Sequence, residues 1–278
     1  MSYKTILAIL QGKYDAARVL GCAVPLAVQH EAHLIGLHAE ALPIPHATPM
    51  GIPDTGFIEA GSEIARERAA EIEAIFAKHC GKGGLSGEWR AMESFSGDSA
   101  LSGLESARCV DLVIAQQRDP DSDSIVADLE ALLFHSGRPA LFIPYAIKVE
   151  PPFRNITLAW NGSAESARAA FDALPLLKAA DETTIIAVDA ETNAGQDAVF
   201  SGAEIAAALS RHGVKVTIQN HQSGDVTAAD IIQNHVSDSG ADLLVTGAYS
   251  QSRLKEFFFG GVTKALLQSM TCATFMSR

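Results

Sequence analysis

The sequence predicts an α/β protein built from two tandem, doubly wound domains, each with a five-stranded parallel sheet. Three observations lead to this prediction. Short apolar runs alternate with helical patterns along the whole chain, an order typical of parallel sheets covered by helices. The second half of the chain repeats the first. The length of 278 residues exceeds that of a usual single domain, and the apolar share of 47% is enough to form a core in each half.

The repeat is clearest at an offset of 150 residues, at which KTILAILQGKYDAAR (4–18) aligns with RNITLAWNGSAESAR (154–168). The same offset aligns 32–39 with 182–189. Further along, the aligned segments are 96–98 with 223–225, 111–115 with 242–246, and 132–142 with 266–276. We therefore predict a first domain at 1–146 and a second at 152–278, joined by the proline-containing linker PYAIKVEPPF (144–153).

The expected strands are unbroken apolar runs, as in sheets with helices on both faces. They lie at 5–10, 33–39, 88–95, 110–115 and 139–144, then at 155–160, 183–189, 214–220, 241–246 and 272–276. Residues 61–79 carry a helical pattern with one apolar face. The stretch 42–57, which holds four prolines, is expected to be an irregular loop. Whether that loop is a lid over a crevice or a plain connection stays open.

The charge balance bears on partners. The formal net charge of −12 argues against nucleic acid and anionic membranes, which both require a basic surface. No apolar stretch approaches the roughly 20 residues that a membrane-spanning helix needs. The four widely spaced cysteines are interpreted as reduced core residues. A cytoplasmic location is therefore expected.

In doubly wound sheets, ligands bind at the carboxyl ends of the strands where the strand order reverses. In the second domain the first strand ends with LAWNGS, so Asn161 lies at this point and could bond a ribose hydroxyl or an adenine edge. The alternative is that Asn161, Gly162 and Ser163 are only a turn and a helix N-cap. The fourth strand ends with LLVTG and opens the segment 247–267, whose glycine N–H groups could hold an anion or could only cap a helix.

This last segment carries a family resemblance. ADLLVTGAYSQSRLKEFFFGGVTKALLQSM resembles the universal stress protein signature, Gly-x2-Gly-x9-Gly-Ser/Thr between the fourth strand and the last helix. ITLAWNGSAESARAAFDALPLL resembles the family's first strand and helix. The resemblance covers the whole second domain and, more weakly, the first. It implies a tandem universal stress protein with a stress-response role and a Rossmann-like fold related to the adenine nucleotide alpha hydrolases.

The resemblance also implies an adenine nucleotide site, and the sequence departs from it at three positions. Gly247 and Gly260 match the first and third glycines, whereas Ser250 replaces the second glycine, Gly261 replaces the Ser/Thr, and Asn161 replaces an acidic residue. We expect weak binding of ATP or AMP, with a metal required only as Mg²⁺ on the nucleotide. The expected binding residues are Ala159, Asn161, Val188, Gly247, Ser250, Gly260, Gly261, Val262 and Thr263.

The first domain is expected to have lost this site. No glycine lies between Gly103 and Gly137. Four aspartates crowd the position that the phosphates would take, where like charges repel one another. They are Asp119, Asp121, Asp123 and Asp128.

Other hypotheses follow from the same residues. The family commonly dimerises through its last strand, so we expect the two domains to form an intramolecular pseudo-dimer, related by a pseudo-twofold and packed through 139–144 and 272–276, which also covers two open edges. A homodimer of the chain is left open. The alternative to nucleotide binding is an interaction scaffold with vestigial pockets and an unknown protein partner. An enzyme is not expected, although slow ATP hydrolysis is a third hypothesis. His33 and His38 face opposite sides of one strand, so no shared metal is expected.

Overall fold

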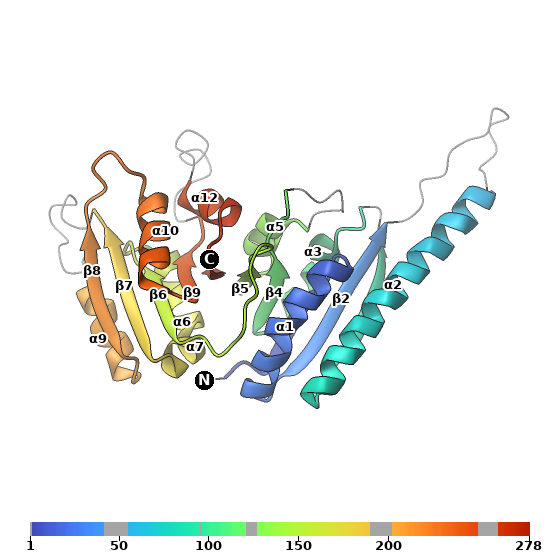
Figure 1. Cartoon of the computed structure of the whole chain (residues 1–278), viewed down its shortest axis with the longest axis horizontal. Helices are drawn as coiled ribbons and strands as arrows, with labels where there is room; N and C mark the ends of the chain where they lie inside the picture. Colours follow the sequence, from blue (N-terminus) through green and yellow to red (C-terminus); the bar gives the residue numbers. More distant parts are fainter. Residues whose placement is uncertain (1, 42–54, 95, 121–126, 190–201, 250–260) are drawn as a thin grey trace.

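The structure is a computed structural model that describes residues 2–41, 55–94, 96–120, 127–189, 202–249 and 261–278. In these residues ten strands form one sheet, in the order β3-β2-β1-β4-β5-β10-β9-β6-β7-β8 (Figure 1). Several sequence predictions fall outside the described residues: those for 42–54 of the proline-rich stretch, for Asp121 and Asp123, and for Ser250 and Gly260.

The first half contributes β1 to β5. Its strands are β1 (Thr5–Ile9), β2 (His33–Ala41), β3 (Glu88–Ser94), β4 (Leu112–Gln116) and β5 (Ala140–Ile143). Its helices are α1 (Lys13–His30), α2 (Thr55–Gly83), α3 (Ser99–Ser102), α4 (Leu104–Ala107) and α5 (Leu129–His135). All strand pairs within this half are parallel.

The second half repeats this arrangement. Its strands are β6 (Asn155–Ala159), β7 (Glu182–Val188), β8 (Val216–His221), β9 (Leu243–Gly247) and β10 (Ala273–Ser277). Its helices are α6 (Ala164–Asp172), α7 (Leu174–Ala179), α9 (Ala203–Arg211), α10 (Ala228–Ser239) and α12 (Val262–Gln268). These strands also pair in parallel. The predicted α/β fold with two five-stranded parallel units is thus confirmed.

The two halves join through their last strands, as the sequence predicts. β10 pairs with β5 in antiparallel fashion, with Phe275 opposite Leu141. This junction makes one ten-stranded sheet that is parallel within each half and antiparallel at its centre. Antiparallel contact between equivalent strands is the geometry of a pseudo-twofold axis normal to the sheet.

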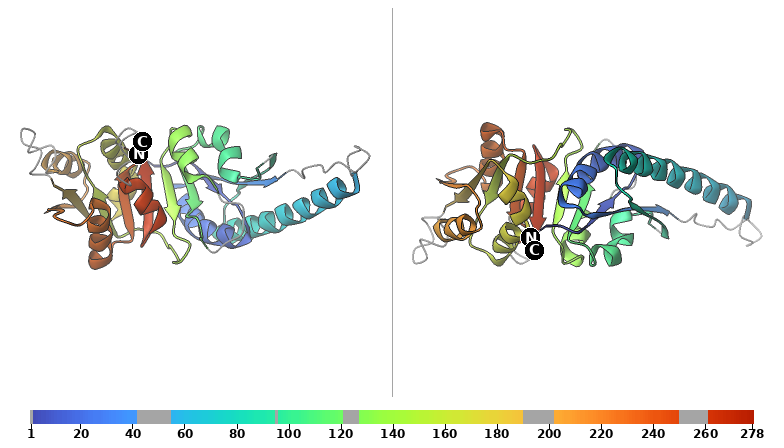
Figure 2. Two further views of the ribbon diagram at one scale, coloured as in Figure 1. Left: turned by 90° about the horizontal axis from the view of Figure 1, so that it is seen from above. Right: turned by 90° about the horizontal axis from the view of Figure 1, so that it is seen from below.

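Helices cover both faces of the sheet (Figures 1 and 2). One hydrophobic core lies under α1, α2, α6, α7 and α9, with residues such as Leu20, Phe76 and Leu177. The other lies under α3, α4, α5, α10 and α12, with residues such as Leu132 and Ile232. Each core runs across both halves, so the halves share their apolar interior. Among the described residues, no helix combines the length and apolarity needed to cross a membrane.

Two details differ from the sequence predictions. Helix α2 begins at Thr55, so residues 55–57 belong to a helix rather than to the expected irregular loop. Proline disfavours helix in the residue before it, and the last proline of the stretch is Pro53, so nothing prevents a helix two residues later. Figure 2 shows that the N-terminal part of α2 extends well beyond the sheet. Cys109 is exposed, whereas Cys22, Cys80 and Cys272 are buried as expected.

Candidate functional site

The candidate site lies where the strand order of the second half reverses. β6 lies between β7 and β9, and its last residue, Ala159, pairs with Ile186 on one side and Thr246 on the other. The residues that follow these three strands therefore meet at one edge of the sheet. They include Asn161 after β6 and Val188 at the end of β7. This is the position at which doubly wound sheets bind ligands.

Asn161 takes part in the turn that leads into α6. Its Oδ1 accepts a hydrogen bond from Ser163 N at 3.1 Å, and Ser163 Oγ in turn accepts one from Ser166 N at 3.1 Å. Ser163 is thus the N-cap of α6, as the sequence predicts. The Asn161 side chain is exposed at the edge of the crevice. Turn formation therefore explains this residue type at least in part, whether or not a ligand binds.

Gly247 is required by packing. A Cβ atom at this position would lie 2.5 Å from the Ser166 nitrogen and 2.6 Å from the Glu165 carbonyl carbon. No side chain can approach a backbone that closely. The first glycine of the motif therefore lets the end of β9 pass against the first turn of α6, a role that needs no ligand.

The last binding residues of the motif lie at the start of α12. Gly261 is the N-cap of this helix, and Val262 is partly exposed. Thr263 is buried, and its Oγ1 accepts a hydrogen bond from Tyr249 N at 3.0 Å. This bond ties the start of the glycine segment to its end. The threonine hydroxyl thus acts as an acceptor for the backbone, a role that the sequence prediction did not foresee.

Asp189 is a site residue that the sequence analysis missed. It directly follows β7 and has a left-handed backbone, with φ of 56°. Its Oδ1 accepts a hydrogen bond from Ser223 N at 2.8 Å. Hydrogen bonding by the Ser223 side chain, together with this backbone bond, holds the pKa of the Asp189 carboxyl below its ordinary value. The left-handed conformation is uncommon outside glycine and is enriched at functional sites. The only signal in the sequence is an aspartate directly after an apolar run.

Tyr249 was also missed, and it links the candidate site to the other half. Its backbone is left-handed, with φ of 54°, and its side chain is buried. Its ring centroid lies 4.4 Å from that of Phe134 in α5. The Arg278 guanidinium lies 4.2 Å from the centroid of the same Phe134 ring. The glycine segment therefore starts from a residue that is packed against the first half.

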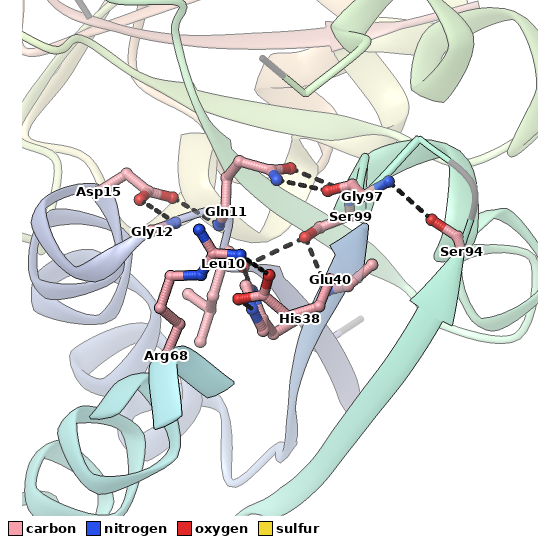
Figure 3. A network of polar contacts seen from close by, with 11 residues as sticks. Leu10, Gln11, Gly12, Asp15, His38, Glu40, Arg68, Ser94, Gly97 and Ser99 are labelled. Carbon is pink, nitrogen blue, oxygen red and sulfur yellow. Dashed lines mark hydrogen bonds and ion pairs between the residues drawn. The ribbon is translucent and has the colours of Figure 1, made fainter. Parts of the chain in front are cut away.

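At the equivalent strand ends of the first half, side chains form a network of polar contacts (Figure 3). Gln11 aligns with Asn161, but its longer amide reaches the segment after β3. Gln11 Nε2 donates to Gly97 O at 2.6 Å, and its Oε1 accepts from Ser99 N at 2.9 Å. Both hydrogen-bonding groups of the amide are thereby used within the protein.

A buried carboxylate, that of Asp98, makes further contacts at the same strand ends. Asp98 is only 5% exposed, and its Oδ2 accepts a hydrogen bond from Asp128 N at 3.0 Å. Its Oδ1 accepts bonds from two backbone N–H groups of α3. Asp225, the aligned residue of the second half, is exposed. The Asp98 carboxylate thus contacts the start of α5 in the first half, whereas the aligned Asp225 of the second half is exposed.

Asp128 also has a structural role that the sequence analysis did not include. The sequence analysis placed it among carboxylates that would repel phosphate. Its Oδ1 accepts a hydrogen bond from Ala131 N at 2.8 Å, so it is the N-cap of α5. N-capping favours a negatively charged side chain at that place. The carboxylates of Asp98 and Asp128 thus both lie at the start of α5, and the repulsion of phosphate at this place stays a prediction.

A second carboxylate lies in the same crevice. Asp15, in the first turn of α1, accepts hydrogen bonds from Gln11 N at 2.7 Å and Gly12 N at 2.5 Å. Burial raises the pKa of Asp15 from its ordinary value of 3.8 to about 6, against the lowering effect of these bonds. Desolvation of the charged form is therefore the dominant effect here.

His33 and His38 lie on opposite sides of β2, as predicted. His33 is half exposed and contacts Glu88, with Nε2 3.0 Å from Oε2. His38 is buried between Leu10 O, 2.7 Å from Nδ1, and Glu40, 3.0 Å from Nε2. Glu40 also pairs with Arg68 of α2 at 2.9 Å (Figure 3). In the part of the chain that the structure describes, no three His, Cys, Asp or Glu side chains are grouped to hold a metal ion.

Comparison with known proteins places this geometry in a family context. Residues 152–278 match the model of the universal stress protein family. No curated protein sequence matches the chain significantly.

Solved structures with the same fold cover both halves. A universal stress protein from Archaeoglobus fulgidus DSM 4304 is similar over 100% of this chain and 97% of its own, at 16% identity and a TM-score of 0.71. A putative universal stress protein from Pseudomonas aeruginosa UCBPP-PA14 is similar over 99% of this chain and 93% of its own, at 16% identity and a TM-score of 0.57. At these identities the structural likeness shows the fold alone.

Proposed function

We propose that the chain, whose residues 152–278 match the universal stress protein family, is a tandem stress-response module of that family. In this proposal only the second half binds an adenine nucleotide, ATP or AMP, and it binds weakly. The ligand lies at the carboxyl ends of β6, β7 and β9. Mg²⁺ takes part only as the ion that accompanies the nucleotide phosphates.

The observation that carries the proposal is the contrast between the two crevices. In the first half, Gln11 bonds both Gly97 and Ser99, and Asp98 is buried against Asp128 N. In the second half, the shorter Asn161 accepts a bond from Ser163 in its own turn, and Asp225 is exposed. Among the described residues of the second half, no carboxylate is buried at the position equivalent to Asp98. This difference favours ligand entry on one side only.

Each binding residue has a role that the family resemblance suggests. Ala159, Asn161 and Val188 would contact the nucleoside, because they lie at the ends of β6 and β7. Gly261, Val262 and Thr263 open α12 and would lie near the phosphates, together with Gly247. Ser250 and Gly260 belong to the same proposed set but lie outside the described residues.

The substitutions in the motif set the expected affinity. The loss of a hydroxyl at Gly261 removes one hydrogen bond, worth about 1 kcal/mol between neutral groups and about 1.5–3 kcal/mol when the partner is charged. A serine at 250 in place of glycine adds about 1 kcal/mol if that backbone is left-handed. Together these costs weaken binding by roughly 30- to 1,000-fold, because each 1.4 kcal/mol is tenfold. A micromolar site would become one of tens of micromolar to millimolar dissociation constant.

Calorimetric titration with MgATP tests the proposal by comparing the parent with the double variant Ser250→Gly/Gly261→Ser. The double variant is expected to bind at least 30-fold more tightly than the parent, because it restores both motif positions. Gly21→Ala, in the middle of α1, is the control and is expected to leave ATP affinity unchanged. Equal affinity of the double variant and the parent would contradict the proposal. Slow hydrolysis would appear as ADP formed in the same sample.

One observation favours a second candidate, a nucleotide-free scaffold with a vestigial crevice. Gly247 is explained by packing against Ser166, and Asn161 by the turn into α6, so neither residue requires a ligand. The scaffold proposal expects no heat of binding from either protein in the titration above. If neither protein gives a heat of binding, the scaffold proposal replaces the nucleotide proposal.

A further inference from the structure

The ten-stranded sheet has two edges, β3 and β8, which occupy equivalent places in the two halves. Ile35 of β2 pairs with Glu88, and Ile185 of β7 pairs with Ile218. The repeat aligns Ile35 with Ile185, at an offset of 150 residues. Glu88 and Ile218 are therefore equivalent positions on the two edges, one charged and one apolar.

The β3 edge carries the charges that commonly prevent edge-to-edge pairing. Glu88 Oε1 accepts a hydrogen bond from Arg90 Nε at 2.7 Å, and Glu88 Oε2 contacts His33 at 3.0 Å. Glu93 adds a further carboxylate to the same strand. A second strand that paired here would have to desolvate these groups, a device by which proteins protect exposed edges.

Among the described residues, the middle of the β8 edge carries no such charges. Residues 216–220, VTIQN, have no ionisable side chain, with Lys215 directly before the strand and His221 at its end, and Ile218 is 41% exposed. The backbone of alternate residues faces away from the sheet. Thr183 N donates to Lys215 O and Asp189 N donates to His221 O, so the odd-numbered residues of this strand face β7. In a parallel pair the intervening residues then direct both N–H and C=O outward. These are Val216, Ile218 and Asn220.

We propose that β8 pairs with the β8 strand of a second copy of this chain, in antiparallel fashion and with Ile218 opposite itself. A twofold axis between identical edges makes the pair antiparallel and closes the assembly at two copies. The register places Val216 opposite Asn220, so all three outward-facing residues form hydrogen-bonded pairs. The chain already uses this device internally, because β5 and β10 join antiparallel with Leu141 opposite Phe275.

A second copy fits this edge better than a charged partner does. The strand offers backbone groups and an isoleucine, and these complement an identical uncharged strand. The net charge of −12 on each copy opposes association at long range. Salt screens this repulsion, so dimerisation is expected to strengthen as ionic strength rises. One strand pair is a small interface, so we expect a concentration-dependent dimer instead of a permanent one.

Sedimentation velocity of the full chain, from about 1 to 200 µM and in low and high salt, tests the proposal over the range of weak association. The parent is expected to shift from one to two copies with rising concentration, more readily in high salt. Ile218→Glu, which copies the charge at Glu88, is expected to stay a single copy. Met92→Glu is the matched control, because Met92 is also 41% exposed but lies on the β3 edge. It is expected to dimerise like the parent.

Two further variants keep the test decisive if Ile218→Glu does not fold. Ile218→Pro removes an outward N–H and leaves the bonds to β7, so it is expected to abolish the dimer. Ile218→Cys with Cys109→Ser is expected to form a disulfide between copies, because Cα atoms of a hydrogen-bonded antiparallel pair are about 5.5 Å apart. A parent that stays a single copy throughout would overturn the proposal. A dimer that survives Ile218→Glu or is lost in Met92→Glu would overturn it equally.

Discussion

Leu141 pairs with Phe275 across the antiparallel junction, and the two residues occupy equivalent positions in the two halves. The repeat aligns Ile6 with Ile156. Ile6 pairs with Leu112 and Ile156 pairs with Leu243, so these two leucines are equivalent. One residue further along these strands, Val113 pairs with Ala140 and Leu244 with Thr274, so the next residues, Leu141 and Phe275, are equivalent. A residue that pairs with its own counterpart lies on the twofold axis. The pseudo-twofold axis therefore passes between these two side chains, and both are fully buried.

The first prediction concerns this junction. Phe275→Ala is expected to lower the free energy of unfolding by about 3–5 kcal/mol, because it leaves a cavity in a core that both halves share. Phe171→Ala is the control: Phe171 is 43% exposed, and its change is expected to cost less than about 1 kcal/mol. Urea unfolding followed by far-ultraviolet circular dichroism measures both. Equal stability of the two variants would show that the junction contributes little.

The second prediction separates packing from ligand binding at Gly247. Gly247→Ala is expected to destabilise the ligand-free protein by about 1–3 kcal/mol, because its Cβ would overlap the backbone at Ser166. Gly21→Ala, inside α1 with open space around it, is expected to stabilise by up to about 1 kcal/mol. Thermal unfolding without nucleotide measures both. A Gly247→Ala variant with parental stability would leave ligand contact as the reason for this glycine.

The third prediction is a pH dependence from Asp15. The folded-state pKa of about 6 lies above the ordinary 3.8, so the folded state holds this proton more tightly than the unfolded state does. Stability from this group is therefore present at low pH and is lost as the pH rises from about 4 through 6. A shift of this size corresponds to about 3 kcal/mol at most.

Asp15→Asn removes the titrating group, so the variant should lose this part of the pH dependence. Urea unfolding at pH 4 and pH 7 is the measurement, and the parent is expected to lose more stability than the variant between these values. Asp181→Asn, at an exposed position paired with Arg154, is the control. If the parent and Asp15→Asn respond to pH identically, the Asp15 carboxyl is not the buried group described above.

Much of the fold could be predicted from the sequence because strands and helices leave local patterns. The runs at Thr5–Ile9 and Asn155–Ala159 are mostly apolar, and each is buried after its first residue, so their strands are visible without tertiary information. The junction was predictable because the family that the sequence resembles commonly dimerises through its last strand, and because the contact covers two open edges. The start of α2 at Thr55 was not, because the prolines before it dominated the pattern.

The candidate site was less predictable because its key contacts join residues far apart in the chain. The bond from Ser99 N to Gln11 Oε1 and the bond from Ser223 N to Asp189 Oδ1 exist only once the sheet has formed. A sequence motif also cannot distinguish two roles for one residue type. Gly247 matches the family motif, yet its close approach to Ser166 shows a packing role.

The most direct test of the central claim is the number of nucleotides bound per chain. Equilibrium dialysis of the parent with labelled MgATP, extended to millimolar nucleotide, measures this number without assuming which half binds. In the first half, Gln11 and Asp98 bond to neighbouring elements, whereas in the second half Asn161 bonds within its own turn and Asp225 is exposed. This difference predicts saturation at one nucleotide per chain. Saturation at two would contradict the closure of the first crevice, and no binding at millimolar ATP would contradict nucleotide binding by the second.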